Sequence, residues 1–149
     1  MQSATQLFSA HLALLASEPE LWRQLYADDA VMEFPYAPTI GAPARYEGVE
    51  AIFNHVQGVF AQLSDPVFGN VSIQPLATPQ LGKEEAPEEE AEEWVVAEFE
   101  IAAVVKNTGR PYNQKYIALM TARRGKIVFL REYWNPQEVI KSFAALPGV

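Results

Sequence analysis

Three strand-length segments follow one another in the second half of the chain, with only very short connections between them. They occupy residues 94–105, 112–122 and 126–134. Asn107-Thr108-Gly109 and Arg124-Gly125 stand at the two connections, and residues of these types favour tight turns. We therefore expect an antiparallel meander, preceded in the chain by a further strand at residues 67–75.

The first half of the chain has helical character. Ser3 and Gln6 fit a capping box, in which the Ser3 hydroxyl accepts from the Gln6 amide and the Gln6 side chain reaches back to the Ser3 N–H. A helix is expected to begin there, and a second, short helix is expected at residues 19–26. From Val49 to Leu63 apolar residues recur every three or four positions, which is the period of a helix laid on a core.

Helices that precede a meander favour an α+β fold, with the N-terminal helices packed on the concave face of a curved antiparallel sheet. A strand at residues 30–34 and a closing helix from Pro136 are expected to complete it. With 149 residues and 49% hydrophobic composition, the chain can bury one core but is short for two. Residues 1–149 are therefore expected to form a single domain with a concave pocket.

Charge is concentrated in one place. The net charge is -8, and seven of the nineteen acidic residues lie within residues 84–93. We expect residues 79–93 to form a mobile, solvated acidic loop. The rest of the chain is nearly neutral and has no basic stripe for a phosphate backbone, so no nucleic-acid partner is expected.

The sequence lacks the residues and motifs that several kinds of catalysis require. The chain has no cysteine, only two histidines, no phosphate-binding glycine loop and no G-x-S-x-G elbow, so neither a cofactor nor a metal is expected. It also shows no leader-like start and no apolar run of about 20 residues, from which we expect a cytoplasmic protein without a membrane partner. Acid–base chemistry and simple ligand binding remain.

Glu132 is an acid in an apolar row. Side chains alternate along a strand, so residues 127, 129, 131 and 133 should share one face, and Val128, Leu130, Glu132 and Trp134 the other. A carboxylate there must pair, accept hydrogen bonds or take up a proton through a raised pKa, and a general acid or base needs the last. Alternatively, Glu132 bonds Gln114 or Tyr116, or lies at an open sheet edge.

Two histidines and several aromatic residues are further candidates. His55 lies on the flank of the apolar stripe of its helix, where it either faces the pocket or is an ordinary boundary residue. His11 lies within the apolar face of the first helix, and packing or capping explains it better. Five aromatic residues with polar tips could line a pocket or belong to the core: Trp22, Tyr26, Tyr36, Tyr116 and Trp134.

The order of elements and four motifs resemble the NTF2-like superfamily, which includes SnoaL-like polyketide cyclases and ketosteroid isomerases. The motifs are residues 26–30, the turn at residues 125–127, the pair Gly48 and His55, and Glu132-Tyr133-Trp134-Asn135-Pro136. The last two, with Tyr112-Asn113 and Tyr116-Ile117, look most like the phenazine biosynthesis A/B proteins. This resemblance implies a cone-shaped curved sheet.

The resemblance also implies roles for two residues. In the phenazine A/B proteins the motif glutamate and the helix histidine are acid–base groups for a cyclic amino-ketone, which here corresponds to Glu132 and His55. We therefore expect a cofactor-free isomerase, cyclase or condensation enzyme for a small cyclic, carbonyl-bearing metabolite. The alternative is a non-catalytic ligand-binding or dimerisation module. A homodimer through the sheet is expected in either case.

Overall fold

The computed structural model describes residues 1–77 and 91–143. Its elements run in the order α1 (Ala4–Leu14), α2 (Pro19–Arg23), β1 (Tyr26–Glu33), the 3-10 helix η1 (Ala37–Ile40), β2 (Arg45–Glu47), α3 (Val49–Phe60), β3 (Leu63–Leu76), β4 (Glu93–Val105), β5 (Pro111–Arg123), β6 (Lys126–Trp134) and α4 (Pro136–Phe143). Most of the acidic loop expected at residues 79–93 lies outside the described residues. Glu93 belongs to β4 rather than to a loop.

The strands form one curved, six-stranded sheet in the order β2-β1-β6-β5-β4-β3. The expected meander is confirmed, since β4, β5 and β6 pair antiparallel with their neighbours. The sheet is not wholly antiparallel, because β1 runs parallel to β6, with Met32 opposite Leu130. A parallel pair needs a long connection, and here residues 34–125, which include α3 and the strands β3 to β5, provide it.

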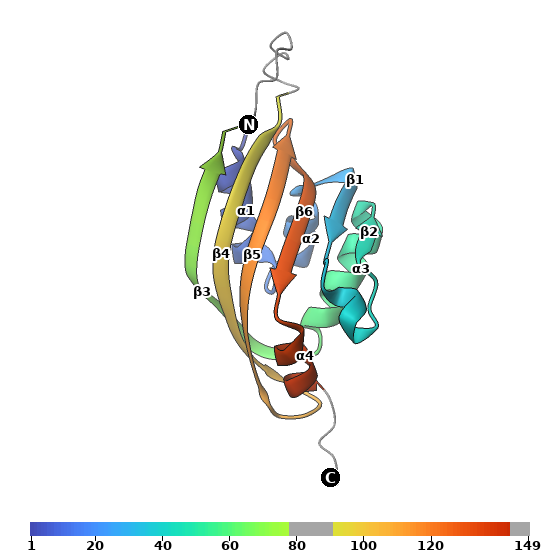
Figure 1. Ribbon diagram of the computed structural model, residues 1–149. Helices are drawn as coiled ribbons and strands as arrows, with labels where there is room; N and C mark the ends of the chain where they lie inside the picture. The colour runs from blue at the N-terminus through green and yellow to red at the C-terminus, as the bar shows by residue number, and fades with distance from the viewer. Residues whose placement is uncertain (78–90, 144–149) are drawn as a thin grey trace.

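The helices α1, α2 and α3 lie on one side of this sheet, as Figure 1 shows, so the expected α+β arrangement is confirmed. α1 begins with the predicted capping box, in which Ser3 Oγ accepts from the Gln6 N–H at 3.2 Å and Gln6 Oε1 accepts from the Ser3 N–H at 2.9 Å. Leu7 and Phe8 are fully buried between the helix and the sheet. Burial of side chains of this size stabilises the fold by roughly 1.5–3 kcal/mol each.

Two helix ends differ from the sequence prediction. α2 ends at Arg23, because Tyr26 already belongs to β1, where it pairs with Ile127. α3 ends at Phe60, and Leu63 opens β3 opposite Val105. In both places an apolar residue that continues the helical pattern belongs to a strand and is buried there. Apolar periodicity by itself therefore predicts a helix that is a few residues too long.

β6 contains a β-bulge that the simple alternation missed. Thr121 lies opposite Phe129 but Ala122 lies opposite Ile127, so Val128 is an extra residue on β6. Ile127 therefore faces the core and is fully buried, and the expectation that it shares a face with Phe129 is wrong. Beyond the bulge the alternation holds, which leaves Leu130, Glu132 and Trp134 on the helix side of the sheet.

No helix in the described part of the chain has both the length and the apolar character needed to cross a membrane.

Candidate functional site

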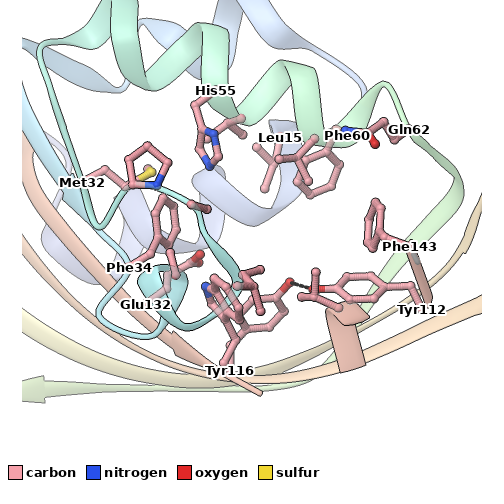
Figure 2. Close-up of a pocket in the computed structure, with 18 of the residues that line it drawn as sticks. Leu15, Met32, Phe34, His55, Phe60, Gln62, Tyr112, Tyr116, Glu132 and Phe143 are labelled. Carbon is pink, nitrogen blue, oxygen red and sulfur yellow. Dashed lines mark hydrogen bonds between the residues drawn. The ribbon is translucent and has the colours of Figure 1, made fainter. Parts of the chain in front are cut away.

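A cavity of about 320 Å³ lies between the concave face of the sheet and the helices. This volume is at the small end of the range for small-molecule sites. Its wall is largely apolar, and Figure 2 shows side chains from opposite sides of the cavity facing one another. The aromatic residues that line it are Phe34, Phe60, Tyr112, Tyr116, Trp134 and Phe143.

Glu132 lies in the wall of this cavity. The strand pairing places it opposite Ala118, whose methyl side chain offers no hydrogen bond. Among the described residues no side chain or backbone group forms a hydrogen bond or an ion pair with its carboxyl group. Burial raises the pKa of Glu132 from 4.5 to about 7, since an apolar surrounding penalises the charged form. Both protonation states are therefore populated near neutral pH.

The alternative partners considered for Glu132 are engaged elsewhere. Gln114 bonds the backbone of Asn135, and the Tyr116 hydroxyl lies against the Tyr112 hydroxyl. Glu132 is not at an open edge either, because β6 lies between β1 and β5.

His55 lines the same cavity from the helix side, as Figure 2 shows. Its ring stacks on Tyr46 with 4.1 Å between ring centroids and an interplanar angle of 17°, and Phe34 packs against it at 5.3 Å. Partial burial lowers the pKa of His55, so the imidazole is neutral near neutral pH. A neutral ring can donate through one nitrogen and accept through the other.

His11 also lies in the cavity wall, although its sequence pattern favoured packing or capping. It is almost completely buried, and its Nδ1 receives the Trp22 Nε1–H at 2.9 Å and contacts the Tyr26 hydroxyl at 2.9 Å. Because the indole can only donate, we assign Nδ1 as the acceptor and place the ring proton on Nε2. Burial lowers the pKa of His11 to about 3, so this ring is neutral as well.

The five aromatic residues proposed as pocket-lining divide into two groups. Tyr116 and Trp134 line the cavity. Trp22 and Tyr26 do not, because both are buried behind His11 and direct their polar tips at it. Tyr36 does not line it either: it is 48% exposed and packs edge-on against Tyr133 at 5.8 Å. None of these three residues is among the described residues that line the cavity.

Two candidate site residues were not predicted as pocket residues from the sequence. Tyr112 lines the cavity and Gln114 stands next to it on the same face of β5, fully buried although polar. The signal was available, since Tyr112, Gln114 and Tyr116 alternate along a strand and must share a face.

The described residues give the cavity wall no positive charge near neutral pH. No lysine or arginine is among its described lining residues, and its two histidines are neutral near neutral pH. An anionic ligand would be desolvated there without a cation to pair with. A neutral ligand does not meet this penalty. In the described part of the chain, no three His, Asp or Glu side chains cluster closely enough to hold a metal ion.

Comparison with known proteins identifies the family. The model of the SnoaL-like domain matches residues 6–130. This chain belongs to the SnoaL-like family. Solved structures of an NTF2-like protein and of a phenazine biosynthesis-related protein have the same fold, at identities of 18% and 13%. The expected NTF2-like fold is confirmed.

The expected resemblance to the phenazine biosynthesis A/B proteins is confirmed as well. An uncharacterised PhzA/B-like protein of Pseudomonas aeruginosa is 31% identical, over 86% of this chain and 78% of its own length. The uncharacterised protein YesE of Bacillus subtilis is 34% identical, over 87% of this chain and 79% of its own length. A crystal structure of a Bacillus subtilis protein with a provisional isomerase assignment is 31% identical, with a TM-score of 0.77 and coverage of 94% and 91%.

Proposed function

We propose that this SnoaL-like protein is a cofactor-free acid–base catalyst that isomerises or cyclises a small, cyclic, carbonyl-bearing metabolite. The observation that carries the proposal is Glu132, a carboxyl group in an aromatic cavity with no hydrogen-bond partner among the described residues and a pKa of about 7. A carboxyl group tuned to this pKa accepts and returns protons near neutral pH with little loss in either direction.

The proposed reaction is a proton shuttle at carbon. The Glu132 carboxylate removes a proton from a carbon next to the ligand carbonyl, and the C–H electron pair moves into an enolate. The protonated carboxyl then returns the proton to a second carbon, which shifts a double bond, or the enolate carbon attacks a second carbonyl carbon of the same ligand, which closes a ring and leaves an alkoxide. Glu132 ends the cycle ionised in the first case, and releases its proton to the new alkoxide in the second.

His55 is proposed to orient the ligand from the opposite wall. Its ring is held by Tyr46 and Phe34, and its neutral nitrogens can bond a polar group of the ligand. The absence of an ion pair between Glu132 and His55 among the described contacts favours separate roles over a shared charge.

The test is exchange of carbon-bound protons. Cyclohexenone incubated with the protein in D2O should incorporate deuterium next to its carbonyl, as followed by NMR. Glu132→Gln should slow this exchange by roughly 10²–10⁴-fold, the usual contribution of a positioned acid–base group. Glu98→Gln is the matched control, because Glu98 is an exposed carboxylate on β4.

Exchange that is equally fast in wild type and Glu132→Gln would contradict the catalytic proposal. Binding of the ketone without any exchange would favour a non-catalytic ligand-binding module instead.

We also propose a homodimer through the outer face of the sheet. No described helix covers that face, and Ile117 on it is 42% exposed beside Tyr133. Ile117→Lys should then convert a dimer into a monomer in sedimentation experiments. A wild-type monomer at micromolar concentration would contradict this proposal.

A further inference from the structure

Gln114 holds a fixed position at the end of the sheet where β6 has ended. Its Oε1 accepts from the Asn135 backbone N–H at 2.9 Å, and its Nε2 donates to the Asn135 carbonyl oxygen at 2.9 Å. This pair of bonds settles the orientation of the amide, because the reversed amide would set two donors and two acceptors against each other. The backbone of the Asn-Pro motif therefore aims one N–H of Gln114 at a defined place.

That N–H is directed at the Tyr112 hydroxyl, to which Nε2 donates at 3.3 Å. The Tyr112 oxygen in turn lies 3.3 Å from the Tyr116 oxygen, the contact drawn in Figure 2. Neighbouring rings fix both phenols. Tyr116 stacks on Phe99 at 4.7 Å and 11°, and Tyr112 packs edge-on against Phe143 at 5.5 Å. The hydroxyl pair is therefore held in place in the wall of the cavity.

The hydroxyl pair has one hydrogen more than it can use internally. The two phenols carry two hydroxyl hydrogens, and the contact between them uses one. No other acceptor among the described residues bonds either hydroxyl, while the Gln114 N–H already supplies a proton to the pair. A hydroxyl donor buried in an apolar wall without an acceptor is costly, and a ligand oxygen would remove that cost.

We infer that Tyr112 and Tyr116 form a hydrogen-bond donor site for a neutral carbonyl oxygen of the ligand. Tyr116 lies opposite Trp134, so Glu132 is its diagonal neighbour on the same face of the sheet, roughly 7–8 Å away between backbone positions. A ligand carbonyl at the hydroxyl pair then places its adjoining ring carbons toward Glu132. This rests on the proposed function for the purpose of the site, but not for its existence.

The same pair suits the charge that enolisation develops. Negative charge would build on the carbonyl oxygen, and hydroxyl donors held in an apolar site stabilise such charge without prior rearrangement. Burial raises the pKa of both tyrosines, so both stay protonated and able to donate. Since no lysine or arginine is among the described lining residues, these donors would select a neutral oxygen acceptor over an anion.

The test is the infrared carbonyl stretch of bound, ¹³C-labelled cyclohexenone. In the wild type it should lie at lower frequency than in an apolar solvent. Tyr112→Phe and Tyr116→Phe each free the remaining hydroxyl to donate, so each should retain part of the shift. The double variant should lose the shift and bind the ketone on the order of tenfold more weakly. Tyr36→Phe is the control, because Tyr36 lies outside the cavity wall.

The ketone should also bind more tightly than methylenecyclohexane, which has a similar shape and no acceptor. A full carbonyl shift in the double variant, equal affinity for the two compounds, or failure of cyclohexenone to bind the wild type would overturn the inference. Glu132→Gln separates the two proposals, since it should strongly slow proton exchange and leave the carbonyl shift in place. An unchanged exchange rate with a normal shift would reject only the catalytic proposal.

Discussion

His11 and Glu132 are two titratable residues in the wall of one cavity, and they differ in what surrounds them. His11 receives hydrogen-bonding partners from Trp22 and Tyr26, which hold its ring in one orientation. Glu132 receives none from the described residues. Burial disfavours the charged form of both, but only at Glu132 does this bring the pKa close to neutral. His11 is thus anchored through Nδ1, although its Nε2 has no partner among the described residues, whereas the carboxyl group of Glu132 has no anchoring partner there at all.

The largest expected effect is that of His11 on the pH dependence of the free energy of unfolding. The pKa of His11 is about 3 in the folded protein against an ordinary 6.5, so only the unfolded chain takes up its proton between these values. The free energy of unfolding should be unaffected by the titration of His11 above pH 6.5. It should fall by on the order of 5 kcal/mol as the pH is lowered toward 3. Urea denaturation at a series of pH values measures this.

His11→Asn is the matched variant, because its amide oxygen can replace Nδ1 as an acceptor without titrating. Its acid destabilisation should be much shallower than that of the wild type. If both proteins lost stability in parallel below pH 6.5, other groups would dominate acid unfolding.

The second effect has the opposite sign and concerns Glu132. Its pKa is raised from 4.5 to about 7, so the folded form keeps a proton that the unfolded chain has lost. The contribution of Glu132 to the free energy of unfolding has its full value below pH 4.5. It declines by on the order of 3 kcal/mol as the pH rises to 7. Glu132→Gln should therefore match the wild type near pH 4 and exceed it near pH 8 in thermal unfolding. Equal stability at the higher pH would show a carboxylate that is already stabilised.

A smaller effect separates the two histidines. His55 is half-buried with a pKa lowered by desolvation, whereas His11 is held by two partners. In an NMR titration, we expect the His55 resonances to move at a pH below 6.5 and the His11 resonances to stay constant down to about pH 4. The nitrogen shifts of His11 should also report a protonated Nε2. Titration of His11 near pH 6 would break the comparison.

The smallest effect is expected outside the cavity. Arg131 donates to Glu33 Oε1 from two nitrogens, at 3.0 and 3.2 Å, on the outer face of the sheet. Solvent screens such a pair, so Arg131→Gln should lower the free energy of unfolding by less than about 1 kcal/mol. A loss as large as that expected from acid titration of His11 would mean that exposure does not separate these groups.

Local sequence patterns predicted the elements and the position of Glu132 well. The capping box at Ser3 and the alternation from Leu130 to Trp134 depend on neighbours within a few residues, so the sequence alone shows them. The role of His11 depends on Trp22 and Tyr26, which lie eleven and fifteen residues away and meet it only in the folded core. The bulge at Val128 is equally hidden, because no residue type marks it.

Sequence patterns also do not tell which aromatic residues line the cavity. Trp22 and Tyr116 have similar character in the sequence, but one ends behind His11 and the other in the cavity wall. Which of these occurs depends on how α1 and α2 seat against the sheet, and composition does not carry that information. Gln114 was within reach of the alternation, but its partner is the backbone of Asn135, which no side-chain pattern reveals.

The parallel pairing of β1 with β6 has a consequence for how the molecule is made. Glu33 and Arg131 are 98 residues apart in the chain and neighbours in the sheet. During synthesis β1 must therefore wait, unpaired on that side, until β6 has left the ribosome. Such distant pairings are slow to close, so we expect the meander to form early and the docking of β1 to limit the folding rate. Binding capacity should consequently appear last in refolding, after most of the secondary structure.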